Sequence, residues 1–372
     1  MVSQNDYRGK TYAVTGSTGF IGNRLVDRLV ENGAQVVCLV RDVERAKRNA
    51  SPSGQITFAA LDIHDPAGLR AALGQAEALV HCAYDWNDEA WNATALDSLI
   101  AAVQADRRTK LVHVSSFVVY DLPASGRVSE ETPPTREPAG YCQVKHQLER
   151  KVIDAAERGS ISAVIIQPTI VYGPRARTWT DEPAMMLSYG SLVLPSDAEG
   201  LCNAVYVDDV VDALMRAIAV EPARGERFLI SGETPVTWKR FYEGMAAAVG
   251  AAGPVYEPSA TIAARNGRKS KLIRELTDPG LLLRRVLRNK IGRTILSLAP
   301  GSVRKTVTSW LDSPLERRRG HRHDPSLSHL ASLRATYVIA CDHARTRLGY
   351  RPRYTFEQGM VPTAAYLKRT FG

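Results

Sequence analysis

Apolar runs alternate with amphipathic segments along the first two thirds of the chain. Polar residues rarely interrupt the runs, which is typical of strands that are buried on both faces of a parallel sheet. The segments between the runs repeat apolar residues at helical spacing. The pattern therefore predicts a parallel sheet covered by helices on both faces, with strands at 11–15, 35–40, 56–60, 78–82, 110–115, 161–167, 205–207 and 227–230.

Helices are predicted between these strands and towards the end of the chain. One of them carries Tyr141 and Lys145, and Asp208 and Asp209 are expected to cap another. The other predicted helices lie at 20–32, 66–73, 88–105, 208–220, 237–249, 340–348 and 355–369. Proline, glycine and aromatic residues replace the alternation between 172 and 204, which predicts loops over a site.

The composition is typical of a globular protein that folds in water. The chain has 372 residues, of which 44% are hydrophobic and 23% are charged, and this length suits one large domain or two joined ones. No apolar run approaches the ~20 residues that span a bilayer, and the polar N-terminus lacks the apolar stretch of a signal peptide. The cytoplasm is therefore the expected location. The five cysteines are scattered, which argues against a disulfide framework and against a metal site.

Most of the net charge of +9 comes from a basic segment at residues 263–322. Arginine and lysine alternate there with apolar residues at helical spacing. Such a surface could touch anionic lipid or a membrane-derived substrate, hold a substrate diphosphate, or be the solvated face of an ordinary helix pair. Aromatic residues are scarce in the segment, so nucleic-acid binding is not expected.

A glycine-rich turn follows the first predicted strand and opens the first predicted helix. Its glycines permit a tight turn and a close approach of the backbone to a pyrophosphate. The helix then offers N–H groups and a partial positive charge to the phosphates. The turn therefore predicts dinucleotide binding, with cofactor contacts from Gly16, Thr18, Gly19, Phe20, Ile21 and Gly22.

The residue that ends the second predicted strand bears on the choice of dinucleotide. NAD-specific sites carry an acidic residue there for the ribose hydroxyls, whereas this chain has Arg41, which can pair with a 2′-phosphate. NADP is therefore the favoured cofactor, and NAD stays as the alternative because Asp42 could serve the ribose. Further cofactor contacts are expected after the third and fourth strands, from Asp62, Ile63, His81 and Ala83.

Tyr141 and Lys145 lie four residues apart, which places both side chains on one face of a helix. Free tyrosine titrates near pH ~10, and a neighbouring positive charge favours the phenolate. Such a pair can therefore donate and accept a proton near neutral pH. Helices also carry this spacing by chance. The glycine turn upstream strengthens the interpretation of the pair as an acid/base centre.

Several motifs together resemble the extended short-chain dehydrogenase/reductase family, also called the NAD-dependent epimerase/dehydratase family. They lie at 15–22, 81–83, 114–120, 167–174, 206–210 and 348–352, and include Asp62, Asn92, Tyr141 and Lys145. The resemblance covers residues 9–250 and 336–370. It implies an α/β fold with a Rossmann-type doubly wound parallel sheet that binds NAD(P) over 1–175, with 205–232 returning to it. A smaller, mainly substrate-binding domain would occupy 176–372 and include a variable basic segment at 255–332.

The resemblance also implies a catalytic set of Ser116, Tyr141 and Lys145. Tyr141 would be the general acid/base, and Lys145 would bind the nicotinamide ribose and lower the pKa of Tyr141. The chemistry supports this assignment independently, because hydride transfer at a carbinol carbon requires a proton to move at its oxygen. Pro168 is expected to contact the cofactor, and the expected substrate-binding residues are Trp86, Ser116 and Trp179.

Departures from the family pattern narrow the reaction. The 4,6-dehydratases carry an Asp-Glu pair just after the catalytic hydroxyl, whereas this chain has Phe-Val-Val at 117–119, which argues against dehydration. Sugar-nucleotide epimerases carry an Asn after the sixth strand, whereas this chain reads Pro-Thr-Ile at 168–170. Gln167 stands where many relatives carry Arg. The predicted function is therefore interconversion of a secondary alcohol and a ketone with NAD(P).

Two other functions stay open at this point. A sugar-nucleotide epimerase would use the same residues and keep its NAD tightly bound. A sensor or scaffold of this fold would bind dinucleotide without turnover. The expected partner is a small-molecule substrate, with membrane or lipid contact through 263–322 and a homodimer as open alternatives.

Overall fold

The computed structural model describes residues 7–106, 108–137, 139–220, 225–268 and 322–371. The chain divides into two compact units. The larger unit holds Met1–Trp179, Cys202–Val236 and Thr336–Pro362, and the smaller unit holds Thr180–Leu201, Thr237–Ala335 and Thr363–Gly372.

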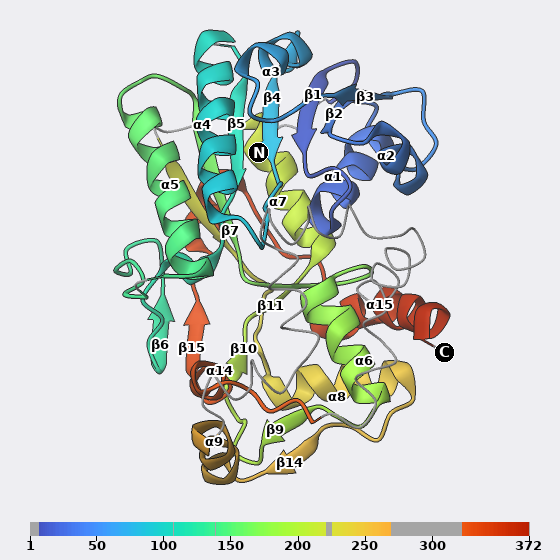
Figure 1. Ribbon diagram of the computed structural model, residues 1–372, viewed down its shortest axis with the longest axis vertical. Coiled ribbons are helices and arrows are strands. Elements are labelled where there is room, and N and C mark those ends of the chain that lie inside the picture. The colour runs from blue at the N-terminus through green and yellow to red at the C-terminus, as the bar shows by residue number, and fades with distance from the viewer. Residues whose placement is uncertain (1–6, 107, 138, 221–224, 269–321, 372) are drawn as a thin grey trace, which may run out of the picture. The chain divides into compact units, whose positions relative to one another are not determined.

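A seven-stranded parallel sheet lies at the centre of the larger unit, with the strand order β12-β7-β5-β4-β1-β2-β3 (Figure 1). The strands are β1 (Thr11–Thr15), β2 (Gln35–Val40), β3 (Ile56–Ala60), β4 (Ala78–His81), β5 (Lys110–Val114), β7 (Ala163–Pro168) and β12 (Glu226–Ile230). This arrangement confirms the predicted parallel sheet, except that the strand predicted at 205–207 lies outside it. The strand order reverses between β1 and β4, and open α/β sheets bind their ligands outside the carboxyl ends of the strands at such a point.

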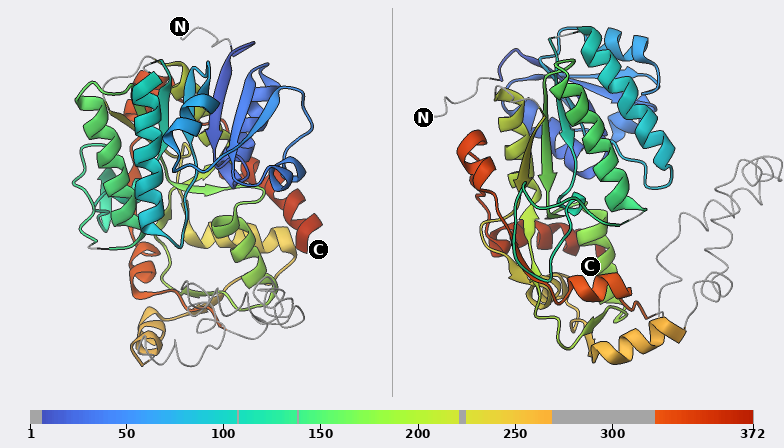
Figure 2. Two further views of the ribbon diagram at one scale, coloured as in Figure 1. Left: turned by 45° about the horizontal axis from the view of Figure 1, so that its top comes forward. Right: turned by 90° about the vertical axis from the view of Figure 1, so that its left-hand side faces the viewer.

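Helices cover both faces of this sheet (Figure 2). On one face, Leu79, Leu111 and Ile165 of the sheet form a buried cluster with apolar side chains of three helices. These helices are α3 (Pro66–Leu73), α4 (Glu89–Asp106) and α5 (Tyr141–Glu157). The opposite face is covered by two helices that pack against each other, α1 (Phe20–Glu31) and α7 (Val207–Ala219). Helix α2 (Val43–Asn49) packs on β3. Burial on both faces is the reason why the strands read as continuous apolar runs.

Two short strand pairs in the larger unit join distant parts of the chain. Strand β6 (Ser125–Val128) pairs in parallel with β15 (Thr336–Ile339). Strand β8 (Ile170–Tyr172) pairs in parallel with β11 (Ala204–Tyr206). Both pairs depend on contacts between segments far apart in sequence, and β6 carries no apolar run from which it could be predicted.

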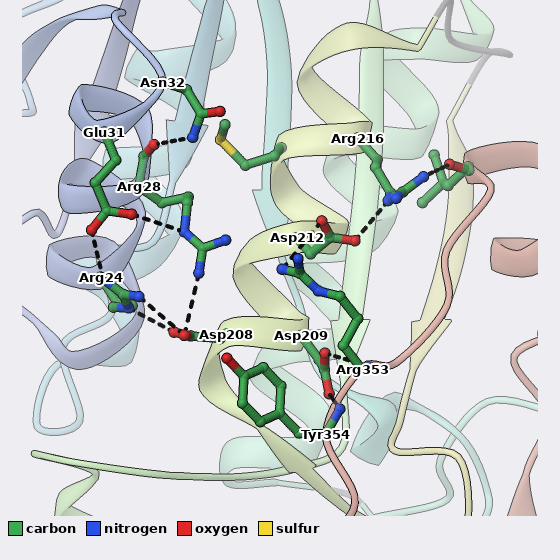
Figure 3. Close-up of polar contacts among 12 residues, drawn as sticks. Arg24, Arg28, Glu31, Asn32, Asp208, Asp209, Asp212, Arg216, Arg353 and Tyr354 are labelled. Carbon is green, nitrogen blue, oxygen red and sulfur yellow. Dashed lines mark hydrogen bonds and ion pairs between the residues drawn. The ribbon is translucent and has the colours of Figure 1, made fainter. Parts of the chain in front are cut away.

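Carboxylates at the start of α7 tie this helix to its neighbours (Figure 3). Asp208 accepts hydrogen bonds from Arg24 of α1 at 2.6 and 3.0 Å and from Arg28 at 3.2 Å. Asp209 accepts from the backbone N–H groups of residues 353 and 354 at 2.8 and 3.3 Å, and burial raises its pKa to about 6. The expected capping of α7 by these two side chains is wrong, because both carboxylates bond to groups outside their own helix.

The smaller unit is built from short elements. They are α6 (Glu182–Ser188), β9 (Val193–Pro195), α8 (Trp238–Val249), β14 (Val255–Glu257), α9 (Ser259–Arg268) and α14 (Leu327–Ser332). Strands β9 and β14 pair in parallel, and Val193, Ile262 and Leu330 form a buried apolar cluster. The remaining elements of the described ranges are η1 (Phe117–Val119), η2 (Arg177–Asp181), β10 (Leu201–Cys202), β13 (Val236–Thr237), η4 (Ala344–Leu348) and α15 (Phe356–Phe371).

Most of the basic segment, residues 269–321, lies outside the described residues. Within the described part of the segment, the side chains of Arg265 and Arg322 are paired with acidic residues. Arg265 lies 2.6 Å from Glu257 and 2.9 Å from Asp324, and Arg322 pairs with the same two carboxylates. The lipid, diphosphate and solvated-face alternatives for the segment stay predictions.

The described residues hold no group of three or more His, Cys, Asp or Glu side chains that could bind a metal ion. Within the same ranges, no helix combines the length and the apolar character needed to cross a bilayer.

Candidate active site

The glycine turn between β1 and α1 packs directly against the chain that leaves β4. Gly16 has a φ of 66°, and a Cβ atom there would lie 2.7 Å from the backbone nitrogen of Ala83. A Cβ atom at Gly22 would overlap the carbonyl oxygen of Gly16. Gly19 is the N-cap of α1 and supplies no side-chain oxygen to the first N–H groups of the helix. The turn therefore has the backbone cradle that a dinucleotide pyrophosphate requires.

The other predicted residues of the turn lie around this cradle. Thr18 is exposed at its tip, and Phe20 and Ile21 are half-buried in the first turn of α1. Pro168 ends β7 and is buried. The structure thus gathers the predicted phosphate-binding residues at the carboxyl ends of the central strands.

Acidic and basic side chains meet beyond the ends of β2 and β3, where the adenosine half of a dinucleotide is expected. The guanidinium of Arg41 lies 5.8 Å from the ring centroid of Trp91. Asp42 caps α2 by accepting a hydrogen bond from the Arg45 N–H at 2.9 Å. Asp62 accepts from the backbone N–H of His64 at 3.0 Å, and its carboxylate lies 2.9 Å from the His64 ring. The Asp42 carboxylate is therefore engaged by its own helix, whereas Arg41 packs over an aromatic face.

His64 and Trp91 lie at the expected adenosine end of the cofactor site, and neither was predicted to bind the cofactor. His64 lies 3.0 Å from the Thr94 hydroxyl of α4 and packs edge-on against Trp91, with ring centroids 5.4 Å apart. Ile63 is buried beside them. The sequence signal for His64 and Trp91 was weak, because only the fold brings the start of α4 to the end of β3.

Ser116, Tyr141 and Lys145 come together where β5 ends and α5 begins. Gly140 has a φ of 84°, and Tyr141 is the first residue of α5. Lys145 donates a hydrogen bond to the carbonyl oxygen of Val114 at 2.9 Å, and its ammonium lies 6.0 Å from the ring centroid of Tyr141. Burial raises the pKa of Tyr141 above its usual value, and a hydrogen bond with the Ser116 side chain offsets only part of that rise. The lowering of this pKa that was expected from Lys145 does not prevail over burial.

Lys145 is almost completely buried, with 6% of its surface exposed. Burial disfavours the charged ammonium and lowers its pKa to about 8. The ammonium also faces the ring of Tyr84 at 4.6 Å, and an aromatic face stabilises a cation. The side chain thus titrates within reach of neutral pH.

Three aromatic rings form a surface that we name the aromatic shelf, made of Tyr84, Trp86 and Tyr141. Trp86 stacks on Tyr141 with centroids 4.7 Å apart and planes inclined by 23°. Tyr84 packs edge-on against both rings, at 5.0 and 5.3 Å. Trp86 is 68% exposed, so the shelf presents a large apolar face next to Tyr141. Trp179 lies in η2.

Two buried histidines lie side by side on β4 and β5. The rings of His81 and His113 stack with centroids 5.3 Å apart, and His81 lies 2.8 Å from the Thr15 hydroxyl. Burial lowers the pKa of His81 to about 3 and that of His113 well below its usual range. Both imidazoles are therefore neutral near pH 7.

A buried carboxylate, Glu149, lies one helical turn beyond Lys145 on α5. It was not among the residues predicted from the sequence. Only 1% of its surface is exposed, and it accepts a hydrogen bond from Ser115 at 2.7 Å. Its position four residues after Lys145 was the one available signal, because that spacing places both side chains on the same helix face.

Known proteins resemble this chain in sequence and in fold. A family model described as the NAD dependent epimerase/dehydratase family matches residues 12–231. The chain is 28% identical over 254 residues to the 2-alkyl-3-oxoalkanoate reductase of Stenotrophomonas maltophilia, an alignment that covers 64% of this chain and 75% of that protein. It is also 28% identical over 261 residues to the UDP-glucose 4-epimerase of Mycolicibacterium smegmatis, covering 64% of this chain and 82% of that protein.

A solved structure of UDP-glucose 4-epimerase from Thermotoga maritima, with UDP-glucose, is similar over nearly the whole chain. The match has a TM-score of 0.67 at 19% sequence identity and covers 97% of this chain and 100% of that one. At this level of identity the likeness shows that the fold is shared.

Proposed function

The chain belongs to the NAD-dependent epimerase/dehydratase family, and we propose that it interconverts a secondary alcohol and a ketone with NADP(H). Members of this family are NAD(P)-dependent enzymes of the extended short-chain dehydrogenase/reductase type. The observation that carries the proposal is the grouping of Ser116, Tyr141 and Lys145 beside the glycine turn. A proton donor, a polarising hydroxyl and a cation at one place are what carbonyl reduction requires.

The roles of the three side chains follow from their chemistry. In the direction of reduction, a nicotinamide cofactor held by the glycine turn would supply the hydride for the carbonyl carbon. Ser116 donates a hydrogen bond to the carbonyl oxygen, and Tyr141 gives that oxygen its proton. Lys145 keeps a positive charge over the ring of Tyr141, which stabilises the phenolate that remains. In the direction of oxidation, Tyr141 takes the proton back.

The aromatic shelf supports an apolar substrate. The exposed face of Trp86 lies beside Tyr141, and a flat apolar surface binds a carbon skeleton better than a charged diphosphate. Trp86 and Ser116 are the proposed substrate contacts, and Trp179 stays a prediction. The name of the Stenotrophomonas relative describes reduction of a 3-oxo acid, which is redox chemistry of the same kind. The Mycolicibacterium relative is named as an epimerase, so that reaction is the second candidate.

The polar groups beyond β2 support NADP as the cofactor. Arg41 can pair with a 2′-phosphate while its guanidinium stays packed on Trp91. Asp42, which could have held the ribose hydroxyls of NAD, is the N-cap of α2. The remaining proposed contacts are Gly16, Thr18, Gly19, Phe20, Ile21, Gly22, Asp62, Ile63, His81, Ala83 and Pro168.

A test of the proposal combines nucleotide identification with turnover. The purified full chain is treated with acid to release bound nucleotide, and the supernatant is analysed by mass spectrometry. The dialysed protein is then assayed for oxidation of NADPH and NADH with apolar 3-oxo compounds, and for epimerisation of UDP-glucose. Exchangeable NADP(H) and ketone-dependent oxidation of NADPH are the expected results. Tightly held NAD with epimerisation of UDP-glucose would overturn the proposal in favour of the second candidate, and bound nucleotide without either activity would favour a sensor or scaffold.

The pH dependence of turnover is expected to follow Lys145. Because the pKa of Lys145 is lowered to about 8, its ammonium is present below that pH and is lost above it. We expect kcat/KM for NADPH to fall about tenfold for each pH unit above the pKa, since this ratio reports the essential groups of the free enzyme. A profile of kcat/KM between pH 6 and pH 10, in buffers of constant ionic strength, measures the effect. A flat profile up to pH 10 would contradict a role for the Lys145 charge.

A further inference from the structure

We propose that Glu149 is a positioning residue that, with Arg227 as its counter-ion, keeps Lys145 in its charged form and fixes α5 against the end of β5. This inference rests on the proposed function, because it assigns Glu149 a role that acts through Lys145. Its evidence is a set of buried contacts behind the candidate catalytic side chains.

Two hydrogen bonds join one face of α5 to consecutive residues at the end of β5. Lys145 donates to the carbonyl oxygen of Val114 at 2.9 Å, and Ser115 donates from its hydroxyl to Glu149 at 2.7 Å. The next residue of the chain is Ser116. The two bonds therefore set the distance between the helix that carries Tyr141 and the strand end that carries Ser116.

The far side of the Glu149 carboxylate faces β7 and β12. Gln167 donates from its amide nitrogen to both carboxylate oxygens, at 2.9 and 2.8 Å, and Tyr120 donates to the Gln167 side-chain oxygen at 2.9 Å. A guanidinium nitrogen of Arg227 lies 3.8 Å from Glu149, and Arg227 also donates to the carbonyl oxygen of Glu130 at 2.8 Å. A buried carboxylate with this many partners is held in a single position.

Of the titratable groups that face Lys145, Glu149 is the one that carries a negative charge near neutral pH. These groups belong to β4 and the loop after it, to β5 and to α5, and they are His81, Cys82, Tyr84, His113, Tyr141 and Glu149. The imidazoles are neutral near pH 7, and burial raises the pKa of the Cys82 thiol to about 12. Burial raises the pKa of Glu149, whereas its hydrogen bonds with Ser115 and Gln167 and the charges of Arg227 and Lys145 oppose that rise.

Arg227 acts on Lys145 through Glu149. The charge of Arg227 opposes the rise in the pKa of the Glu149 carboxyl, and the Glu149 carboxylate favours the ammonium of Lys145. Removing the carboxylate should make the ammonium easier to lose, and removing the guanidinium should have the same effect to a smaller extent, because the carboxylate remains. A purely structural role for the two residues would not change the pH at which the ammonium is lost.

The test measures NADPH affinity by fluorescence titration from pH 6 to pH 10 in the full chain and three variants. For Glu149→Gln, the pH above which affinity falls should decrease by about one unit, since a nearby opposite charge shifts a pKa by about 1–3 units. For Arg227→Gln, this pH should decrease by a smaller amount. Glu157→Gln is the matched control, because it removes a carboxylate from the exposed end of the same helix, and the pH above which its affinity falls should stay at the wild-type value.

The outcomes separate this inference from the proposed function. Wild-type protein that binds no NADPH at any pH would overturn the proposed function. Wild-type binding whose pH dependence is changed by neither substitution would overturn the inference alone. If circular dichroism shows that the Glu149→Gln protein is unfolded, Arg227→Gln decides. A fall in affinity that begins at lower pH than in the wild type supports the inference, and one that begins at the same or a higher pH overturns it.

Discussion

Replacing Tyr141 by Phe is expected to lower kcat about 10³-fold, since a positioned general acid contributes about 10²–10⁴-fold to such reactions. The substitution removes the proton donor and leaves the ring. The stack on Trp86 at 4.7 Å therefore remains, and so does the aromatic face towards Lys145. Steady-state turnover of a ketone with NADPH measures the loss, and fluorescence titration should show NADPH affinity within about threefold of wild type.

Tyr84→Phe is the matched control for this experiment. Tyr84 also belongs to the aromatic shelf and also faces Lys145, at 4.6 Å, but it has no assigned role in proton transfer. Its loss of a hydroxyl should leave kcat close to the wild-type value. Turnover that survives in Tyr141→Phe, or that is lost equally in Tyr84→Phe, would show that the catalytic assignment is wrong.

Replacing Arg41 by Asp is expected to weaken NADP binding about 100-fold and to raise the relative preference for NAD. A hydrogen bond to a charged group contributes about 1.5–3 kcal/mol, and the new carboxylate also repels the 2′-phosphate. Titration of NADPH and NADH with both proteins gives the ratio of the two affinities, which is the relevant quantity because it cancels general effects on the fold.

Lys47→Asp makes the same change of charge nearby and serves as the control. Lys47 lies on α2 and pairs with Glu44 at 3.2 Å on the exposed surface, where such pairs contribute little. We expect its effect on NADPH affinity to be about threefold or less. Equal losses in the two variants would show that Arg41 acts through general charge and does not bind the 2′-phosphate.

The local sequence pattern was sufficient to predict the strands, the turn and the helix that position the candidate site. The continuous apolar runs of β1, β2 and β5 reflect burial on both faces of a parallel sheet, which leaves no polar face to interrupt the run. The glycine turn was also predictable, because Gly16 and Gly22 have no room for a Cβ atom, and that constraint is visible as residue type. The spacing of Tyr141 and Lys145 follows from helix geometry alone.

Long-range contacts were beyond the reach of the sequence. Asp208 has the residue type and position of a helix cap, but Arg24 and Arg28 lie within reach on α1 and bind it instead. Strand β6 forms only because β15, far along the chain, lies beside it. In each case the local preference was weaker than a partner that only the folded chain supplies.

Residue type and spacing were enough to predict the sheet and the cofactor turn, because each depends on one or two neighbouring elements, and the family resemblance implied the three candidate catalytic side chains. Tertiary packing set which groups surround these side chains. It placed Glu149 between Ser115 and Arg227 and stacked Trp86 on Tyr141. It also excluded water around Lys145, so that the pKa of this lysine falls to about 8. Burial and the charge of neighbours set these properties, and both exist only when distant segments pack together.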